Sequence, residues 1–530
     1  MAAGGQGADH PRTGMGLVIL ASTLGTVFEW YDFFVYGTLA AIIAQHFFPA
    51  DNPSASLLIT LATFGVGFGM RPLGALLFGV LGDRLGRKYT FLATVALMGG
   101  ATAIIGVLPT YHQIGLAAPI LLLLARVAQG LALGGEYGGA AIYVAEHADR
   151  RRRGLYTSFI QAGVIGGFLL SLTVVLASNA FVDKAQWEAW GWRLPFVFSL
   201  VLLAVSLWIR LKLHESPVFR QMQAEGEIAH NPLRESFDSW AKVRRILVAL
   251  FGVAAGLTVI WYTAQFQSLY FLQSALRIED TAARLIVGGA AIVSLGLFLF
   301  VGWLSDLIGR KPPIVIGYVL SLLLLFPLFH AMAAAGNPDL AAAMARAPVV
   351  VKGGDCAYDP FVTGKQATAC GRLLDALAKK GVAYTKLDAP KDSAPQITIG
   401  GKPVAADPAA LDAGLAEAGY RLDKVRPPLG SAIRVALAIV GIGLLSALTY
   451  GPVAALLVEL FPARVRYTSM SVPYHIGTGY FGGFLPFISQ LIVVKTGDPF
   501  AGLWYTIAVV AVALVVTIFG LPETAGKELD

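Results

Sequence analysis

Long apolar stretches separated by short polar loops run through most of the chain. Twelve of these stretches reach the length of about 20 residues that a helix needs to cross a bilayer core of about 30 Å. They lie at residues 16–45, 56–82, 89–109, 117–145, 154–181, 191–211, 246–273, 283–304, 313–335, 430–459, 468–494 and 501–521. The pattern predicts an all-α polytopic membrane protein with twelve transmembrane helices.

Basic side chains gather in the loops at one end of these helices. They occupy residues 83–88, 149–153, 210–245, 306–311 and 462–466. The opposite loops HFFPADNPS (46–54) and LPTYHQIG (108–115) contain neither Lys nor Arg. The positive-inside rule therefore predicts that the basic loops and both termini face the cytoplasm.

Composition narrows the class of function. Hydrophobic residues make up 56% of the chain and charged residues only 14%, with a mean hydropathy of +0.67. The loop bias accounts for most of the net charge of +7, so no nucleic-acid partner is expected. No GxxxxGK[ST] phosphate loop follows a strand, and no His/Cys cluster has metal-ligand spacing. An enzyme, an ATP-driven pump and a metal site are therefore not expected.

One charged motif occurs twice and reveals an internal repeat. GVLGDRLGRK (79–88) matches GWLSDLIGRK (302–311) at an offset of 223, whereas EHADRRRRGLYTS (146–158) matches ELFPARVRYTS (459–469) at an offset of 313. The excess of 90 fits a polar insertion after the ninth helix, which indicates two parallel six-helix repeats. The predicted units are a six-helix bundle (1–211), a cytoplasmic linker (212–245), helices seven to nine (246–336), the insertion (337–428), and helices ten to twelve with a short tail (429–530).

The ordered set of motifs resembles one transporter family. The chain is similar to the metabolite:proton symporter branch of the major facilitator superfamily. The resemblance is carried by the two repeated decapeptides and by four further motifs: FEWYDFFVYG (28–37), FGMRPLGALLFG (68–79), RVAQGLALGGEYGG (126–139) and LPET (521–524). That branch includes carriers for proline and betaine, α-ketoglutarate, citrate and shikimate. The resemblance implies a monomeric secondary carrier in a bacterial inner membrane that uses protons as coupling ion and needs no other cofactor. It covers all twelve helices but not the insertion.

Charged residues at the basic ends of the helices are candidates for a cytoplasmic gate. A carboxylate there can accept hydrogen bonds from a facing helix N-terminus and from Arg side chains, and these contacts would break when the gate opens. The alternative is that the charges only set topology, although an acid is not needed for that. The candidates are Asp83, Arg84, Arg87, Lys88, Glu146, Arg153, Asp306, Arg310, Lys311, Glu459 and Arg466. Because Arg84 becomes Leu307 in the second copy, the first latch is expected to contribute more gating energy.

Ionisable residues near the bilayer midplane are candidates for proton coupling, because they are costly there. At about 1.5 Å per residue, Asp32 on helix one and Arg126 on helix four lie at comparable depth. Related sugar carriers place an acid and an Arg on these two helices, so the resemblance implies a coupling pair. The alternative is a permanent structural ion pair. Glu29 and Glu136 are further candidates for the proton site, or internal hydrogen-bonding residues.

Arg71 is the candidate for substrate chemistry. Its planar guanidinium suits a carboxylate, and the local stretch GMRPLG supplies no partner. Glu29 or Glu136 could instead neutralise it. Polar residues that could complete a substrate pocket, or simply form hydrogen bonds between helices, are Gln129, Tyr137, Gln161, Tyr262, Gln265, Tyr474 and His475. His475 is also a possible second proton site or a structural histidine.

The insertion changes from a two-residue to a 3.6-residue apolar period along its length. This pattern predicts strand, loop, helix, strand, strand, helix, a small α/β domain on the periplasmic or outer face. Its order resembles a glutaredoxin-like half without a CxxC pair. Cys356 and Cys370 are the two cysteines of the chain and are expected to form a structural disulfide, with free thiols or a redox role as alternatives.

These observations predict proton symport of a small organic solute by alternating access. An organic anion is the preferred substrate class, because Arg71 and Arg126 are both expected in the cavity. A zwitterion such as proline or betaine is the alternative, disfavoured because the chain ends at KELD without the heptad extension expected of an osmosensing relative. A membrane-anchored sensor or thiol-redox protein that acts through the insertion is a third interpretation.

Overall fold

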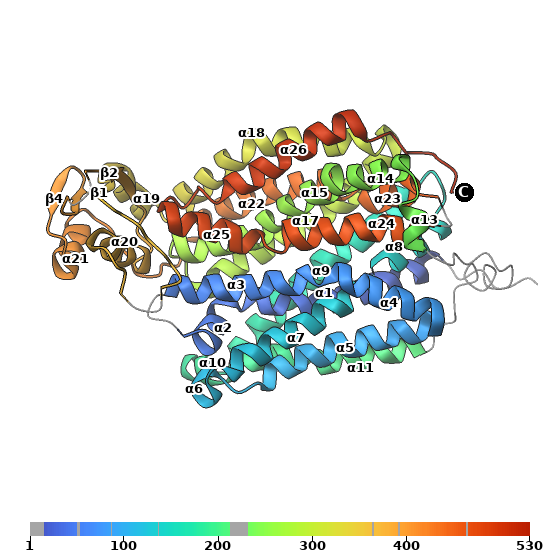
Figure 1. Cartoon of the computed structure of the whole chain (residues 1–530), viewed down its shortest axis with the longest axis horizontal. Coiled ribbons are helices and arrows are strands. Elements are labelled where there is room, and N and C mark those ends of the chain that lie inside the picture. Colours follow the sequence, from blue (N-terminus) through green and yellow to red (C-terminus); the bar gives the residue numbers. More distant parts are fainter. Residues whose placement is uncertain are drawn as a thin grey trace, which may run out of the picture.

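The computed structural model describes residues 15–49, 53–85, 87–135, 137–211, 232–362, 365–390, 393–462 and 465–529. These residues form an elongated helical bundle with a small α/β unit at one end (Figure 1). We call this the insertion end of the bundle. The opposite end, where Arg153, Arg310 and Arg466 lie, is called the basic end.

The first half of the bundle consists of helices up to residue 211. They are α1 (Met15–Thr38), α2 (Ala40–Phe47), α3 (Pro53–Gly69), α4 (Arg71–Leu85), α5 (Arg87–Val107), α6 (Tyr111–Ile114), α7 (Ala117–Leu133), α8 (Tyr137–His147), α9 (Arg153–Phe181), α10 (Lys184–Ala189), the 3₁₀ turn η1 (Gly191–Arg193) and α11 (Leu194–Leu211).

The second half contains several π-helical segments within its spans. Its elements are α13 (Pro232–Ser236), α14 (Trp240–Leu247), η2 (Val248–Ala254), α15 (Ala255–Tyr262), η3 (Thr263–Gln267), α16 (Ser268–Tyr270), η4 (Phe271–Ala275), α17 (Asp280–Ile308), α18 (Lys311–Gly336), α22 (Leu429–Tyr450), α23 (Val453–Leu460), α24 (Arg466–Ile476), η6 (Gly477–Gly482), α25 (Leu485–Thr496) and α26 (Leu503–Gly520). Segments η2, η3, η4 and η6 are π-helical.

The helices agree with the predicted membrane topology. Among the described residues, ten helical stretches are long and apolar enough to cross a membrane. Helices α1 and α2 provide an eleventh if the 61° bend between them lies within one span, and a shorter apolar helix at residues 92–107 lies where the third span is predicted. The predicted fold class, an all-α membrane protein with a small α/β insertion, is confirmed.

The two halves meet along several helix pairs, and α23 and α24 also pack against α8. Helix α9 packs along α17, and the stretch α3–α4 packs against α24, η6 and α25. Within the first half, α7 approaches α3 and α4 closely. A Cβ atom on Gly130 would collide with the carbonyl oxygen of Gly67, and one on Gly134 with that of Arg71, so only glycine fits at these two positions. Small residues permit this close packing between membrane helices. It fixes the position of Arg71 at the centre of the bundle.

The insertion is a separate α/β unit with its own apolar core. It consists of α19 (Pro338–Arg346), β1 (Val349–Gly353), α20 (Ala369–Lys379), β2 (Thr385–Asp388), β3 (Gln396–Ile399), β4 (Lys402–Val404) and α21 (Pro408–Glu417). The sheet order is β2-β1-β3-β4, with β1 parallel to β2 and antiparallel to β3. Sequence reasoning predicts the order of helix and strands but misses α19 and β4, which are only nine and three residues long.

Cys356 and Cys370 are joined by a disulfide. The bond links the segment that follows β1 to the first turn of α20, which begins at Ala369. Gly353, the last residue of β1, lies against both sulfur atoms, since a Cβ atom there would be 2.8 Å and 3.0 Å from them. The disulfide is therefore packed at the edge of the sheet where the parallel strands β1 and β2 end.

Candidate functional site

A small cavity lies between the two halves and is lined mostly by aromatic rings. Its lining residues are Trp30 of α1, Val164 of α9, Thr258, Trp261 and Tyr262 of α15, Tyr450 of α22, Tyr474 of α24 and Thr478 of η6. The cavity has a volume of about 10 Å³, which leaves room for about one water molecule. Among the described residues, this cavity therefore has no space for a solute.

Arg71 lies beside this cavity, at the start of α4, and is fully buried. Its Nη1 donates a hydrogen bond to Thr478 Oγ1 of the other half at 3.0 Å. Its guanidinium carbon is 5.2 Å from the ring centroid of Trp30 and 5.7 Å from that of Tyr474. Its Nε and Nη2 have no hydrogen-bond partner among the described residues, and no described acid pairs with it.

The polar edges of the same region come from both halves. The hydroxyl groups of Tyr450 and Tyr474 are 2.6 Å apart. The Tyr262 hydroxyl and the Trp261 indole nitrogen have no hydrogen-bond partner among the described residues. His475 is fully buried next to Tyr474, and neither of its ring nitrogens has such a partner. Buried polar atoms without partners are costly, so these atoms are candidates for contact with a ligand or with water.

Arg126 is buried in the first half and is not among the residues that line this cavity, although it lies within electrostatic range of Tyr262, which does. Its Nη1 donates to Gln129 Oε1 at 2.5 Å, and its guanidinium carbon is 4.0 Å and 4.5 Å from the ring centroids of Phe33 and Tyr36. Gln129 Nε2 in turn donates to the main-chain carbonyl of Asp32 at 3.2 Å. The expected direct pair of Asp32 and Arg126 does not form in this structure, because Gln129 lies between them.

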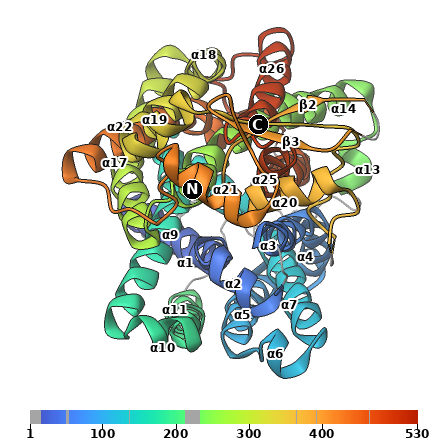
Figure 2. The same cartoon turned by 90° about the vertical axis from the view of Figure 1, so that its left-hand side faces the viewer.

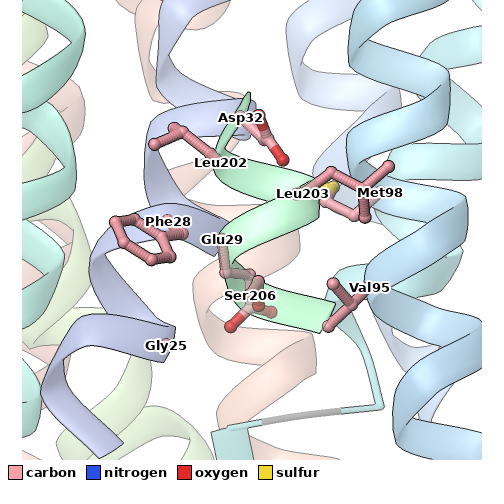
Figure 3. A pocket seen from close by; sticks show the side chains of 9 residues that line it. All are labelled: Gly25, Phe28, Glu29, Asp32, Val95, Met98, Leu202, Leu203 and Ser206. Atoms are coloured by element: carbon pink, nitrogen blue, oxygen red, sulfur yellow. The ribbon is translucent and has the colours of Figure 1, made fainter. Parts of the chain in front are cut away.

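Asp32 and Glu29 line a second small cavity within the first half (Figure 3). They are three residues apart on α1, and the remaining walls come from α5 and α11, including Val95, Met98 and Leu203. Asp32 is 5% exposed, and its Oδ1 has no hydrogen-bond partner among the described residues. The cavity volume of about 20 Å³ suffices for one water molecule.

The structure scatters the other predicted pocket residues. Gln161 on α9 and Gln265 on η3 are both buried, but neither is among the residues that line the two cavities. Glu136 and the side chain of Tyr137 lie outside the described residues. Of the eight predicted substrate residues, Arg71, Tyr262, Tyr474 and His475 lie in or beside the aromatic cavity.

At the basic end, Glu459 of α23 is the centre of a buried ion-pair network. Its Oε1 accepts from Arg153 of the first half at 3.0 Å and from Arg310 at 3.1 Å. Its Oε2 accepts from Arg310 Nε at 3.2 Å and from the hydroxyl of Thr524 at 2.9 Å. The side chains of Glu459, Arg310 and Arg153 are at most 6% exposed.

Asp306 connects the same network to the N-terminus of α9. Its two carboxylate oxygens accept from the backbone N–H groups of Gly154 at 2.7 Å and Leu155 at 2.8 Å, while Arg310 Nη1 donates to it at 2.7 Å. A carboxylate on a helix N-terminus satisfies free N–H groups and the helix dipole. The second copy of the repeated motif therefore joins the two halves as predicted for such an acid.

Further contacts close the basic end. Arg466 pairs with Glu146 across the halves at 3.3 Å. Glu523, in the C-terminal segment, accepts from the backbone N–H groups of Arg310 at 2.8 Å and Lys311 at 3.0 Å, and so caps α18. Lys311 Nζ donates to the carbonyl of Ile518.

Four predicted gate residues cannot be placed. The side chains of Asp83, Arg84, Arg87 and Lys88 lie outside the described residues.

The insertion end is closed by aromatic rings. Two rings of the second half pack against Phe34 of the first half. The ring centroid of Phe34 is 5.4 Å from that of Phe266 and 5.1 Å from that of Trp261. Phe64 and Phe168 of the first half complete this cluster around Phe266. The Tyr270 hydroxyl donates across the halves to the carbonyl of Gly37 at 2.9 Å. The central cavity is thus closed at both ends.

Comparisons with known proteins agree with this architecture. Residues 17–251 match the family model described as sugar (and other) transporter. The inner membrane metabolite transport protein YhjE of Escherichia coli is 40% identical over 331 residues, 61% of this chain and 74% of that protein. The proline/betaine transporter of Escherichia coli is 38% identical over 317 residues, 59% of this chain, and the chain spans 63% of that relative's length. The crystal structure of a D-xylose–proton symporter superposes with a TM-score of 0.61 at 17% identity, over 97% of this chain and 99% of that one.

Proposed function

Because the chain belongs to the major facilitator superfamily, and there to the metabolite carriers, we propose that it imports a small zwitterion of the proline and betaine kind by proton symport. The observation that carries the proposal is the combination of Arg71 with the aromatic cavity. The Nε and Nη2 atoms of Arg71 have no hydrogen-bond partner among the described residues and could donate to a carboxylate. Trp30, Trp261, Tyr262, Tyr450 and Tyr474 offer ring faces and edges nearby.

A zwitterion uses both features, because it carries a carboxylate and an ammonium group on one small skeleton. The carboxylate is matched by the planar guanidinium of Arg71. A quaternary or secondary ammonium is attracted to the faces of aromatic rings, an interaction of about 2 kcal/mol or more when it is desolvated. The match to a proline/betaine transporter supports this substrate class.

An organic anion is less well supported than the sequence suggests. That preference depends on two guanidinium groups in one cavity, whereas Arg126 is engaged by Gln129 and by the rings of Phe33 and Tyr36. With Arg71 alone, the cavity has charge for one carboxylate, and a di- or tricarboxylate would leave a charge unpaired.

The cavity that contains Glu29 and Asp32 is the proposed proton site. Protonation of a buried carboxylate removes its charge and therefore favours closed states that exclude water. Asp32 is linked to Arg126 through its main chain and Gln129. The main-chain carbonyl of Phe64 on α3 accepts from Arg126 Nη2 at 3.5 Å. This chain of contacts therefore reaches α3, which is followed by α4 and its first residue, Arg71. We propose that this route couples the proton to the substrate.

Alternating access then requires the two closed ends to open in turn. The basic end, which we propose faces the cytoplasm, would open by separating Glu459 and Asp306 from α9. The insertion end would open by separating the Phe266 cluster. In the proposed cycle, the zwitterion and the proton enter from the insertion end and leave at the basic end.

Uptake by proteoliposomes tests this function. Labelled betaine, proline, and mono-, di- and tricarboxylates are offered with and without an inward proton gradient. Gradient-driven accumulation of betaine or proline is expected, and it should disappear in Arg71→Gln but persist in Arg421→Gln, an exposed Arg of the insertion. Accumulation of dicarboxylates instead would favour the organic-anion interpretation, and uptake of every solute without a gradient would refute symport.

A variant of Asp32 tests the coupling. In Asp32→Asn, betaine should still exchange across the membrane, because binding at Arg71 remains. Gradient-driven accumulation should be lost, because the amide of Asn cannot take up and release a proton as a carboxyl group does. Counterflow and gradient-driven uptake are measured on the same vesicles. Unchanged accumulation would remove Asp32 from the proton pathway and leave Glu29 to be tested in the same way.

A further inference from the structure

The α/β insertion is docked firmly on the second half of the bundle. Val425 exchanges backbone hydrogen bonds with the loop before α17, donating to Arg277 at 2.8 Å and accepting from Glu279 at 2.9 Å. Ion pairs Lys424–Asp280 and Arg426–Glu279 flank this contact. The unit is therefore expected to move with the second half when the halves rock.

A second set of contacts reaches the helices that close the insertion end. The backbone N–H of Tyr384 donates to the carbonyl of Gly497, just after α25, at 3.1 Å. The ring of Phe361 lies 6.5 Å from that of Phe487 of α25. Helix α20 contacts α3, which belongs to the first half, and Figure 2 shows α20 beside α3 and α25.

These contacts bridge the interface that must open. Helices α3 and α25 pack against one another across the two halves, and Phe64 of α3 is part of the aromatic cluster. If the insertion moves with the second half, the contact between α20 and α3 has to break when the insertion end opens. The insertion therefore stabilises the state in which that end is closed.

The disulfide joins the parts of the insertion that make this bridge. Cys370 lies in the first turn of α20, and Cys356 lies five residues before Phe361. Cys356 is the more exposed of the two cysteines, at 6% against 1%. Lys386 Nζ donates to the carbonyl of Cys356 at 3.3 Å, so a positive charge lies at the main chain of this cysteine. Cations and helix N-termini both favour a thiolate.

We propose that the insertion is a clamp on the gate at the insertion end, and that thiol–disulfide exchange at Cys356–Cys370 weakens this clamp. Reduction frees the segment that carries Phe361 from the first turn of α20. The bridge between α20 and α3 then loses its support, and the insertion end opens more readily.

The chemistry requires an external dithiol. One thiolate of the dithiol attacks Cys356 Sγ, the bond to Cys370 breaks, and Cys370 leaves as a thiolate that takes up a proton. The second thiolate of the dithiol then attacks the mixed disulfide, so that the dithiol is oxidised to a disulfide and Cys356 is released as a thiol. Two electrons and two protons are transferred to the protein in total.

Hydrogen exchange of the full-length protein in lipid nanodiscs tests the clamp without any substrate, and so independently of the proposed function. The protein is compared before and after treatment with dithiothreitol, and thiol counting verifies that the number of free thiols rises from none to two. Exchange at the amides of residues 53–69 and 485–496 should become about fivefold faster or more, as expected for coupling above 1 kcal/mol. The α9 N-terminus at the basic end should not change.

Two variants separate the clamp from damage to the insertion. Phe361→Ala, with the disulfide intact, should reproduce part of the faster exchange in α3 and α25. Lys402→Ala, which removes an exposed ion pair of β4 with Glu417, should not. Cys356→Ser/Cys370→Ser should behave like the reduced protein and no longer respond to dithiothreitol. Unchanged exchange in α3 and α25 after verified reduction, or faster exchange confined to residues 349–420, would overturn the proposal.

Discussion

The two ends of the bundle are closed by different kinds of interaction. At the basic end, Glu459 and Asp306 hold Arg153, Arg310 and the N-terminus of α9 in a buried charged network. At the insertion end, Phe266 and its aromatic neighbours close the interface with a single cross-half hydrogen bond from Tyr270 among the contacts described above. In the proposed alternating-access cycle, the first is a polar gate and the second an apolar gate.

The difference determines how each gate responds to a perturbation. Opening the polar gate separates buried charges, which water then solvates, so the loss of one partner leaves a charge uncompensated. Opening the apolar gate exposes rings to water, so its strength depends on buried area and ring packing. A charge-neutralising substitution should therefore affect only the basic end, and a change of ring volume only the insertion end.

The largest effect is expected for Glu459→Gln. The substitution leaves Arg153 and Arg310 buried without their shared carboxylate, and breaking a buried pair costs about 3–5 kcal/mol. Spin-label distances between α9 and α24 at the basic end should lengthen, while those at the insertion end stay the same. Glu417→Gln, which breaks the exposed pair with Lys402, is the matched control. Unchanged distances at the basic end would show that this network is not the gate.

A smaller effect, at the other end, is expected for Phe266→Leu. Phe266 packs against several rings, and each aromatic pair contributes about 0.5–1.5 kcal/mol beyond buried area, so about 2 kcal/mol should be lost. Spin labels on α3 and α25 should then report a larger open population at the insertion end. Phe326→Leu, which removes a ring contact with Trp504 within the second half, serves as control. Opening at the basic end instead would contradict the division between the gates.

The smallest effect, and the one that depends on pH, is expected for Glu523. Partial burial alone would raise the pKa of this carboxyl group, but four backbone N–H donors outweigh it and hold the pKa below its ordinary value of about 4.3. Its stabilisation is therefore complete above pH 4.3 and is lost as the pH falls through the depressed pKa.

Glu523→Gln tests this pH dependence. The substitution should cost about 1 kcal/mol at pH 7, as for a helix cap. Thermal unfolding followed between pH 7 and pH 3 should show the difference from the natural chain shrinking only at the acidic end of this range. Glu528→Gln, in an exposed pair with Arg150, should show almost no difference at any pH. A difference between natural chain and Glu523→Gln that vanishes above pH 5 would contradict the depressed pKa.

Sequence alone predicts the fold class, and it singles out the charged residues that form the ion-pair network at the basic end. Apolar length and the bias of basic loops are one-dimensional signals, and the repeated motif places Asp306 and Arg310 at a helix end. A charged residue at a helix end is expected to contact oppositely charged side chains or the ends of neighbouring helices. Asp306 and Arg310 could therefore be expected to join helices. The gate residues Glu459 and Arg466 are likewise found by the second repeated segment.

The centre of the bundle is harder to predict. The helical rise gives the depth of a residue in the membrane, but not the direction in which its side chain points around the helix axis. Asp32 and Arg126 are therefore predicted to pair, whereas in the structure Gln129 lies between them. Trp30, Trp261 and Tyr450 of the cavity are missed, because an aromatic residue on an apolar helix is usually a core residue. Thr478 is missed because nothing in its local sequence points to its contact with Arg71. The π-helical segments η3 and η6 shift the helix faces there, and no simple periodicity indicates them.

The zwitterion site is tested most directly by competition between betaine and 3,3-dimethylbutanoate, which has the same shape and carboxylate but a neutral carbon in place of the ammonium nitrogen. Displacement of labelled betaine from the purified protein is measured for both compounds. If Arg71 and the aromatic rings recognise the two charges of a zwitterion, the neutral isostere should bind about thirtyfold or more weakly, which corresponds to a desolvated cation–π contact of about 2 kcal/mol. Equal competition by the two compounds would show that only the carboxylate is recognised, and would contradict the proposed substrate class.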